Sequence, residues 1–181
     1  MSLSYPLAFP SIGISNFQLS FRKSVAFSES PFSYAQQVHD FGGARWDAQV
    51  TIPPLNQTQA QSFQAFLIGL EGRKGTFTLG NPLHSSALSR TATGSKGDTD
   101  LTFSGEVPVG TYFSIANKLY ITTETGTTNV NIQPPLRADA SSATVDFTQP
   151  LGTWRLATNE VNWSTGTSQL TSFTFACTEV V

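Results

Sequence analysis

Two histidines, His39 and His84, are the side chains in this sequence best suited to act as a general base near neutral pH. His39 is followed directly by Asp40 and stands close to Gly42-Gly43, a composition typical of a polar hairpin tip rather than of a base with its orienting acid. The members of a catalytic triad need only meet in space, so a small hydrolase stays open as one alternative. No Gly-x-Ser-x-Gly motif supports it. We therefore predict no catalytic residue and no enzyme activity.

Phosphate and metal binding have equally little support. Residues 93–98 contain the glycines and lysine of a phosphate-binding loop, but they lack its Gly-x-x-x-x-Gly-Lys-Ser/Thr spacing and a following helix. Asp98, Asp100 and Glu106 do not have the spacing of a calcium loop. Cys177 is the only cysteine, so the chain can form neither an internal disulfide nor a cysteine-based metal site. We expect a turn at residues 93–98, no metal and no cofactor.

Three tryptophans could stack on sugar rings if a β-sheet exposed them. Trp46 alternates in step with Ala48 and Val50, which predicts packing in a core. Trp163 has polar neighbours on both sides and could face either way. A carbohydrate-binding β module is therefore the main alternative function, and Trp154 or Trp163 would carry it. If all the tryptophans were buried, this alternative would lose its mechanism.

The elements that would position these residues are mainly β-strands. Alternating apolar and polar side chains predict half-buried strands at residues 17–21, 44–52 and 173–177. We expect Gly42-Gly43 to turn the chain into the second of these strands, and Pro53-Pro54-Leu55 to end it.

One segment, at about residues 57–70, has helical periodicity. Asn56 is a good N-cap, and Gln59 stands where a capping box requires it. Gly72 is expected to end the helix. A lone helix with one apolar stripe is expected to cover one face of a sheet. The stripe consists of Ala60, Phe63, Phe66, Leu67 and Leu70.

After about residue 83 the sequence becomes rich in turns. Residues 111–122 predict a hairpin across Ala116-Asn117, and further strands are expected at residues 128–132 and 144–147. We assign residues 83–151 to an inserted small β-barrel or sandwich, and residues 1–82 together with 152–181 to a first domain. The predicted fold class is α+β and mostly β: an antiparallel β-sandwich with one short helix and a β-hairpin arm, plus the inserted β domain.

The composition indicates a surface that contacts other proteins. Only 12% of the residues are charged, against roughly 25% in ordinary soluble domains. A monomer usually relies on surface charge to stay soluble, although a secreted β protein rich in Ser and Thr is another interpretation. The formal net charge of −2 argues against binding nucleic acid through its phosphates. We find neither a signal-peptide pattern nor an apolar run long enough to span a membrane, and expect the chain to be kept in a cytoplasm or to leave it inside a particle.

Short motifs follow one another along most of the chain. They are residues 27–32, Trp46-Asp47 with Val50, Pro53-Pro54-Leu55, Phe66-Leu67, residues 71–77, Gly80-Asn81-Pro82, residues 110–115, Lys118-Leu119-Tyr120, Pro135-Leu136-Arg137, Trp154-Arg155-Leu156, Val161-Asn162-Trp163 and residues 173–177. Each motif alone is weakly specific, but their order resembles the distal tail protein family of long-tailed bacteriophages and related tail proteins.

The resemblance implies a structural protein of the virion without enzyme activity. The first domain, with its helix and long hairpin, would assemble with other copies into a ring, expected to be a hexamer. The ring would join the tail tube to the tail hub or tip, in a virion assembled in the host cytoplasm. The implied partners are other copies of the chain, the tail tube protein and the hub or tip proteins, with no membrane and no specific nucleic acid. The outward domain varies in this family, and some versions bind carbohydrate or a receptor-binding protein.

The expected subunit interface is the polar side of the hairpin. We expect residues 36–39 to lie opposite residues 44–51, with the first of these strands too polar to be core. An arm of this kind can add to the sheet edge of a neighbouring copy, and such contacts close into rings when the rotation permits. The predicted contact residues are Gln36, Gln37, Arg45, Asp47 and Gln49.

Overall fold

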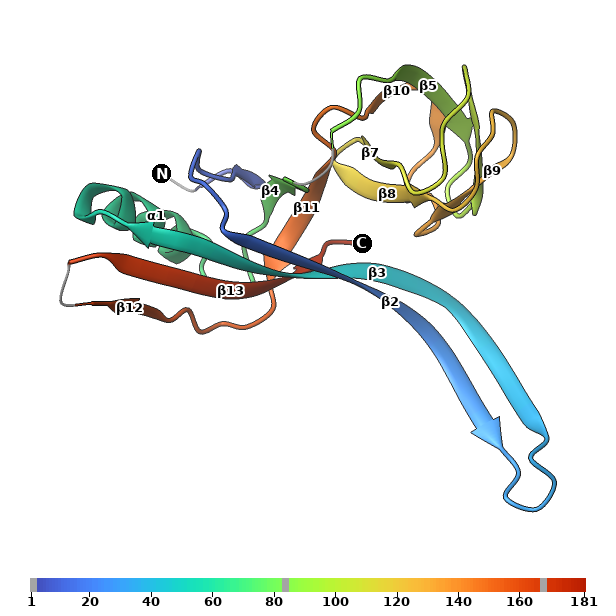
Figure 1. The fold of residues 1–181 in the computed structure, drawn as a ribbon, viewed down its shortest axis with the longest axis horizontal. Helices are drawn as coiled ribbons and strands as arrows, with labels where there is room; N and C mark the ends of the chain where they lie inside the picture. Colours follow the sequence, from blue (N-terminus) through green and yellow to red (C-terminus); the bar gives the residue numbers. More distant parts are fainter. Residues whose placement is uncertain (1–2, 83–84, 167–168) are drawn as a thin grey trace.

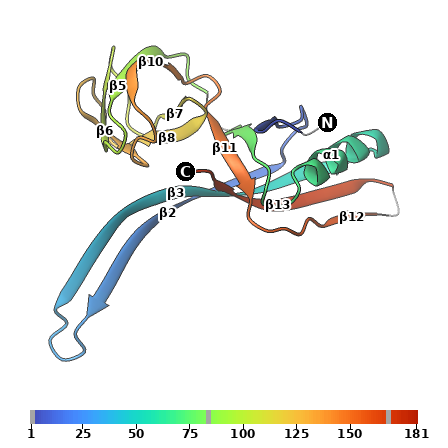
Figure 2. The same cartoon turned by 180° about the vertical axis from the view of Figure 1, so that it is seen from behind.

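The computed structural model describes residues 3–82, 85–166 and 169–181. Figures 1 and 2 show three parts: a sheet with a helix on it, a barrel beside the sheet, and a two-stranded arm that projects from it. Strands dominate, and these residues contain a single helix. The expected class, a mostly-β α+β fold with one short helix, a hairpin arm and a small β-barrel, is therefore confirmed.

The open sheet is built from both ends of the chain. Its strands follow the order β1-β4-β11-β13-β3-β2, and β12 also pairs with β13. All of these pairs are antiparallel except β1 with β4. The bounds are β1 (Leu7–Ala8), β2 (Asn16–Glu29), β3 (Gln36–Leu55), β4 (Phe77–Gly80), β11 (Leu151–Leu156), β12 (Trp163–Thr165) and β13 (Thr171–Glu179).

Helix α1 (Gln57–Gly69) covers one face of this sheet. Phe63 on the helix is fully buried, and its ring centroid lies 4.9 Å from that of Phe173 on β13. The buried side chains Val50 and Ile52 of β3 belong to the same core. Burial of this face explains why alternate residues of the predicted strands are apolar.

The helix begins where the sequence predicts but ends earlier than predicted: its last residue is Gly69, and Glu71, with φ 50°, is the first left-handed residue after it. The side chain of Asn56 accepts a hydrogen bond from the backbone N–H of Gln59 at 3.0 Å. Gly72 has φ +67°, a conformation that glycine adopts without steric cost. The stripe residues Ala60, Phe63, Leu67 and Leu70 are buried, and Phe66 is half-buried.

Six further strands close into a barrel in the order β10-β5-β6-β9-β8-β7. All of them lie between β4 and β11 in the sequence, and β4 and β11 are neighbours in the sheet. This places them within the segment 83–151, although the division into two domains stays a prediction. The bounds are β5 (Ser89–Gly94), β6 (Asp100–Phe103), β7 (Tyr112–Ile115), β8 (Lys118–Thr122), β9 (Val130–Gln133) and β10 (Ala140–Asp146).

Two turns of the barrel lie where the sequence predicts them. Strands β7 and β8 are joined by Ala116 and Asn117, whose φ angles of 50° and 59° suit a tight hairpin turn. Residues 95–99 connect β5 with β6, and the Asp98 carboxylate accepts a hydrogen bond from the backbone N–H of Ser95 at 2.7 Å. That loop is therefore a structural turn.

The long hairpin reverses at a different place from the one predicted. Gly42 and Gly43 lie inside β3, and the chain turns at residues 30–35 instead. Residues 36–39 therefore belong to the same strand as residues 44–51, and they pair with residues 26–29 of β2. The glycine pair forms a β-bulge: the register with β2 shifts here, and Gly42 has φ +71°. Glycine suits both a turn and a bulge, so the sequence did not distinguish them.

The end of β3 also differs from the prediction. The strand continues through Pro53 and Pro54 to Leu55. Pairing with β2 has stopped at Thr51, and the register with β13 shifts between Thr171 and Phe173. Proline is tolerated at such a bulge because it donates no ladder hydrogen bond there.

Candidate functional site

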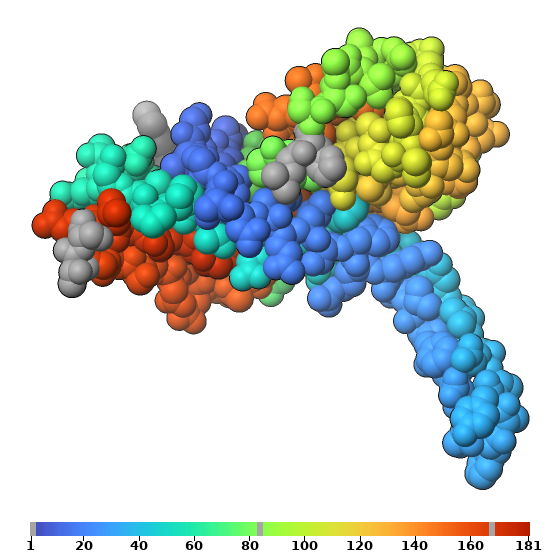
Figure 3. Space-filling view, viewed as in Figure 1, coloured from blue at the N-terminus to red at the C-terminus, as the bar shows by residue number. Residues whose placement is uncertain are grey.

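The arm, defined here as residues 24–43, is the most distinctive feature of the surface. Figures 1 and 3 show it projecting away from both the sheet and the barrel. On the other side of β3, β13 pairs only as far as Asp47, so within the described part of the chain both edges of the arm lack a strand partner. A two-stranded hairpin is marginally stable by itself in water. The arm therefore has the backbone groups and the geometry to pair with another protein.

One face of the arm carries an apolar stripe. Val25, Phe27 and Val38 have exposed fractions of 43%, 61% and 62%. Phe27 and Val38 are directly paired across the strands, so their side chains share a face. The same face of β2 contributes Phe17 and Leu19 to the core of the sheet. The face of β2 that packs into the core thus continues along the arm, where its apolar side chains are exposed. An exposed apolar patch of this kind is typical of an interaction surface.

Two aromatic side chains stand at the tip of the arm. Phe32 is 95% exposed and Tyr34 is 73% exposed. The backbone N–H of Tyr34 donates to the carbonyl of Ser30 at 2.9 Å, and the Ser30 hydroxyl accepts from the N–H groups of Phe32 and Ser33. Tyr34 has φ +55°, which is uncommon for a bulky side chain. The tip is therefore an ordered loop that displays aromatic rings to the outside.

Asp40 fixes the bulge where the arm meets the sheet. Its carboxylate lies 2.6 Å from the ammonium group of Lys23 and accepts a hydrogen bond from the N–H of Gly42 at 2.8 Å. The hydrogen bond from Lys23, followed by that from Gly42, lowers the pKa of Asp40 below its usual value. The ion pair connects the two strands where their register shifts.

Two of the predicted contact residues, Gln36 and Gln37, lie near the tip and are exposed. The side-chain amide of Gln36 donates to the carboxylate of Glu29 at 2.8 Å, across the last pair of the hairpin. Together with the aromatic residues they form the distal end of the arm.

The other three, Arg45, Asp47 and Gln49, lie on the sheet beyond the bulge. The Asp47 carboxylate bridges Arg45 at 3.2 Å and Arg22 at 3.1 Å. Eight residues of extended strand separate Arg45 from Gln37, on the order of 25 Å. The five residues therefore form two separate surfaces, and their role as subunit contacts stays a prediction.

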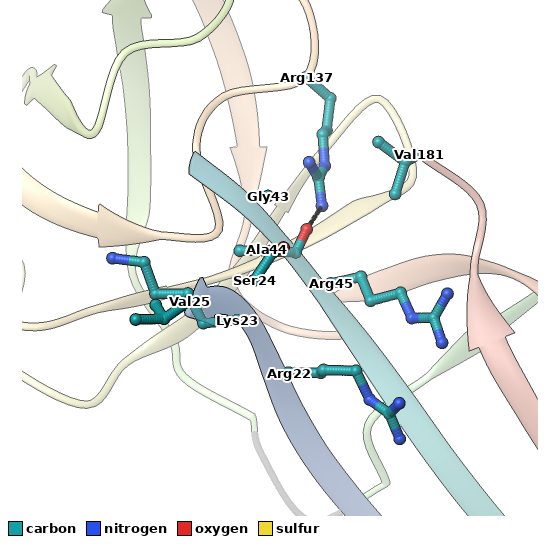
Figure 4. A pocket seen from close by; sticks show the side chains of 9 residues that line it. All are labelled: Arg22, Lys23, Ser24, Val25, Gly43, Ala44, Arg45, Arg137 and Val181. Atoms are coloured by element: carbon teal, nitrogen blue, oxygen red, sulfur yellow. Dashed lines mark hydrogen bonds between the residues drawn. The ribbon is translucent and has the colours of Figure 1, made fainter. Parts of the chain in front are cut away.

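A groove of about 600 Å³ lies at the base of the arm (Figure 4). Arg22 and Arg45 extend side by side along one side of β3, whereas Lys23 extends on the other side and Arg137 points at Ala44. Four basic side chains line the groove, and three carboxylates pair with them. The groove therefore has an excess of one positive charge. The described residues that line the groove include no acidic one; they are Arg22, Lys23, Ser24, Val25, Gly43, Ala44, Arg45, Arg137 and Val181.

A buried ion pair joins the barrel to the sheet next to this groove. The guanidinium group of Arg137 lies 3.1 Å from the carboxylate of Glu179 and donates to the carbonyl of Ala44 at 2.6 Å. The same Glu179 oxygen accepts the backbone N–H of Trp46 at 3.1 Å. The indole N–H of Trp46 in turn donates to the carbonyl of Leu119 in the barrel at 3.0 Å. These bonds hold the barrel in one position on the sheet.

No motif in the sequence predicts this ion pair. Its one available signal was periodicity, because Glu179 continues the inward-facing alternation of Phe173, Phe175 and Cys177. The side chain of Cys177 is buried, which raises the pKa of its thiol well above the usual value.

Of the two histidines first considered for chemistry, the structure describes one. His39 lies on the exposed arm with its ring against that of Phe41, at a centroid distance of 4.6 Å. His84 lies outside the described residues. Within the described ranges, no group of three or more His, Cys, Asp or Glu side chains could hold a metal ion.

The tryptophans divide into two buried ones and an exposed one. Trp46 and Trp154 are 4% and 0% exposed, and the indole N–H of Trp154 donates to the carbonyl of Leu79 at 2.9 Å. Both are core residues, so the prediction that Trp154 could stack on a sugar is wrong. Trp163, on β12, is 42% exposed and remains available for stacking.

Among the residues described, no helix is long and apolar enough to cross a membrane. No protein-family model matches the chain, and no curated protein matches it significantly.

Proposed function

We propose that this protein is a structural subunit of a bacteriophage tail, without enzyme activity, that assembles into a ring. The ring, expected to be a hexamer, serves as the distal adaptor between the tail tube and the tail hub or tip. The observation that carries the proposal is the arm, whose strand edges and apolar stripe are left uncovered by the chain itself. The order of motifs that resembles distal tail proteins supplies the biological setting.

The apolar stripe supports assembly on energetic grounds. Phe27 and Val38 together expose a continuous apolar surface, and covering it in a neighbour releases about 25 cal/mol for each Å² removed from water. The polar edge groups of the arm gain hydrogen bonds if the neighbour supplies a strand. With only 12% charged residues, the surface offers little repulsion between copies.

The sheet presents two unlike edges that a head-to-tail arrangement would use. Its terminal strands, β2 and β1, differ in length and direction of pairing, so the two edges of one copy are different surfaces. Contacts between unlike surfaces of identical chains generate rings when the rotation closes. The barrel and the rim of such a ring would then be free to meet the tail tube protein and the hub or tip proteins.

Light scattering coupled to size-exclusion chromatography tests this proposal. We expect the full chain to elute with a mass near six times its 19.5 kDa. A variant in which residues 25–40 are replaced by a two-residue turn should elute as a monomer with an unchanged barrel, because it has lost the uncovered surface. A wild-type chain that stays monomeric at every concentration, and is missing from purified tail particles, contradicts the proposal.

Carbohydrate binding is the second candidate, and the exposed Trp163 favours it. This side chain is exposed on a short strand of the sheet, and sugars stack on such aromatic faces. Retention on a glycan column that is lost in Trp163→Ala, with folding unchanged, would support this function over the adaptor.

A further inference from the structure

The tip of the arm combines aromatic rings with negative charge. Phe32 and Tyr34 are the most exposed aromatic side chains of the described chain. Glu29 lies beside them, and the arm contains neither lysine nor arginine between Ser24 and Gly43. The local hydrogen bonds of Ser30 shape the loop at this tip.

The groove at the base of the arm has the opposite character. Val25 and Ala44 give its lining apolar side chains, and its four basic residues carry one positive charge more than the three carboxylates that pair with them. Its volume of about 600 Å³ falls within the usual range for binding cavities, roughly 300–1,000 Å³. A Phe and a Tyr side chain fit a space of that size, and the basic rim matches the charge of Glu29.

The two surfaces cannot meet within one chain. Strands β2 and β3 stay paired from the bulge to Glu29 and Gln36, and the rise of an extended strand places the tip roughly 25 Å from the bulge. Figure 3 shows the arm pointing away from the body, so the tip stands clear of its own groove. The groove of another copy is not held at this distance, so the tip can reach it.

We propose that the tip of each arm docks into the groove at the base of the arm of the next copy. Phe32 and Tyr34 enter the groove, and Glu29 lies against its basic rim. This inference rests on the proposed ring and specifies the contact that forms it: the arms run end to end, each tip on the next base. Because Arg137 of the barrel forms one wall, the groove exists only when the barrel is seated on the sheet.

Mixed cross-linking tests the contact directly. One variant carries Phe32→Cys and a second carries Ser24→Cys, which lines the groove. The native Cys177 is buried and does not interfere. We expect a disulfide-linked dimer when the two variants are mixed and oxidised, and none when Phe32→Cys is mixed with Val109→Cys, an exposed position on the barrel side.

The double variant Phe32→Ser, Tyr34→Ser provides the second measurement. It should weaken self-association by about 100-fold or more, since central aromatic residues dominate binding energy at interfaces. Ile68→Ser, which removes a comparably exposed apolar side chain from the helix, should leave self-association unchanged.

The outcomes separate this inference from the proposed function. If the wild-type chain forms rings while the mixed cross-link is absent and the double variant still assembles, the docking contact is wrong and the ring stands. If the double variant forms rings but no longer binds a tail hub protein, the tip recognises that protein and the inference is also wrong. A wild-type chain that neither assembles nor cross-links overturns both.

Discussion

Glu179 links the barrel to the sheet through its contacts with Arg137 and Trp46. Its side chain is fully buried, and one of its oxygens accepts from both Trp46 and Arg137. A buried ion pair is weak evidence for stability by itself, because desolvation offsets the attraction. Removing one partner is different, since the charge of the other stays buried without compensation. The pair therefore specifies a geometry more than it adds stability.

The variant Glu179→Gln tests this reasoning at the residue scale. We expect it to lower the free energy of unfolding by about 3 kcal/mol, because Arg137 loses its counter-charge while buried. Urea denaturation followed by tryptophan fluorescence measures the change. Glu106→Gln, at an exposed position of the barrel, is the matched control and should change stability by less than about 0.5 kcal/mol. A loss as small as that of the control would mean that the ion pair does not hold the two parts together.

At the scale of elements, local sequence predicts the start of the helix but not the position of the turn in the long hairpin. The helix begins at the Asn56 cap that the local sequence predicts, and it ends at Gly69, before the predicted stop at Gly72. The hairpin contains the stronger glycine signal, Gly42-Gly43, inside a strand, and turns at residues 30–35. A bulge at that point lets β3 serve both the sheet and the arm.

The cap of α1 gives a prediction at this scale. Asn56→Ala removes the side-chain oxygen that accepts from the N–H of Gln59, and should lower the free energy of unfolding by about 1 kcal/mol. Gln57→Ala changes an exposed neighbour and should have almost no effect. Chemical denaturation of both variants measures the difference, and equal stabilities would show that the cap contributes nothing.

At the scale of the whole molecule, the sheet and the barrel each bury a core, whereas the arm leaves its apolar side chains exposed. The two cores are closed by the chain's own residues. Among the described residues no third strand pairs with the arm, which exposes the apolar residues that a third strand or a neighbour would cover. A structure of this kind is expected to become stable throughout only after assembly.

Hydrogen exchange measures this difference between the arm and the body. In dilute solution, amides of residues 25–40 should exchange rapidly, since local opening of an unsupported hairpin needs little free energy. If the proposed ring forms at high concentration, their exchange should slow there by about tenfold or more, while β7 and β8 in the barrel stay equally protected in both conditions. An arm that is strongly protected in the monomer would mean that it needs no partner.

The sequence by itself determined the elements whose signals are local. The helix with its stripe, the strand at residues 44–52 and the turn at Ala116-Asn117 are set by periodicity, capping and turn chemistry between near neighbours. Burial of Trp46 followed from the same alternation. The fold class was predictable for this reason.

Only the tertiary structure decided which distant residues meet. It placed Arg137 on Glu179, separated Gln36 and Gln37 from Arg45, and gathered basic residues at the base of the arm. These are long-range relations, fixed by strand pairing and packing rather than by spacing along the chain. Of the residues first considered for chemistry, His39 and Asp40 lie on the arm, where Asp40 stabilises a bulge.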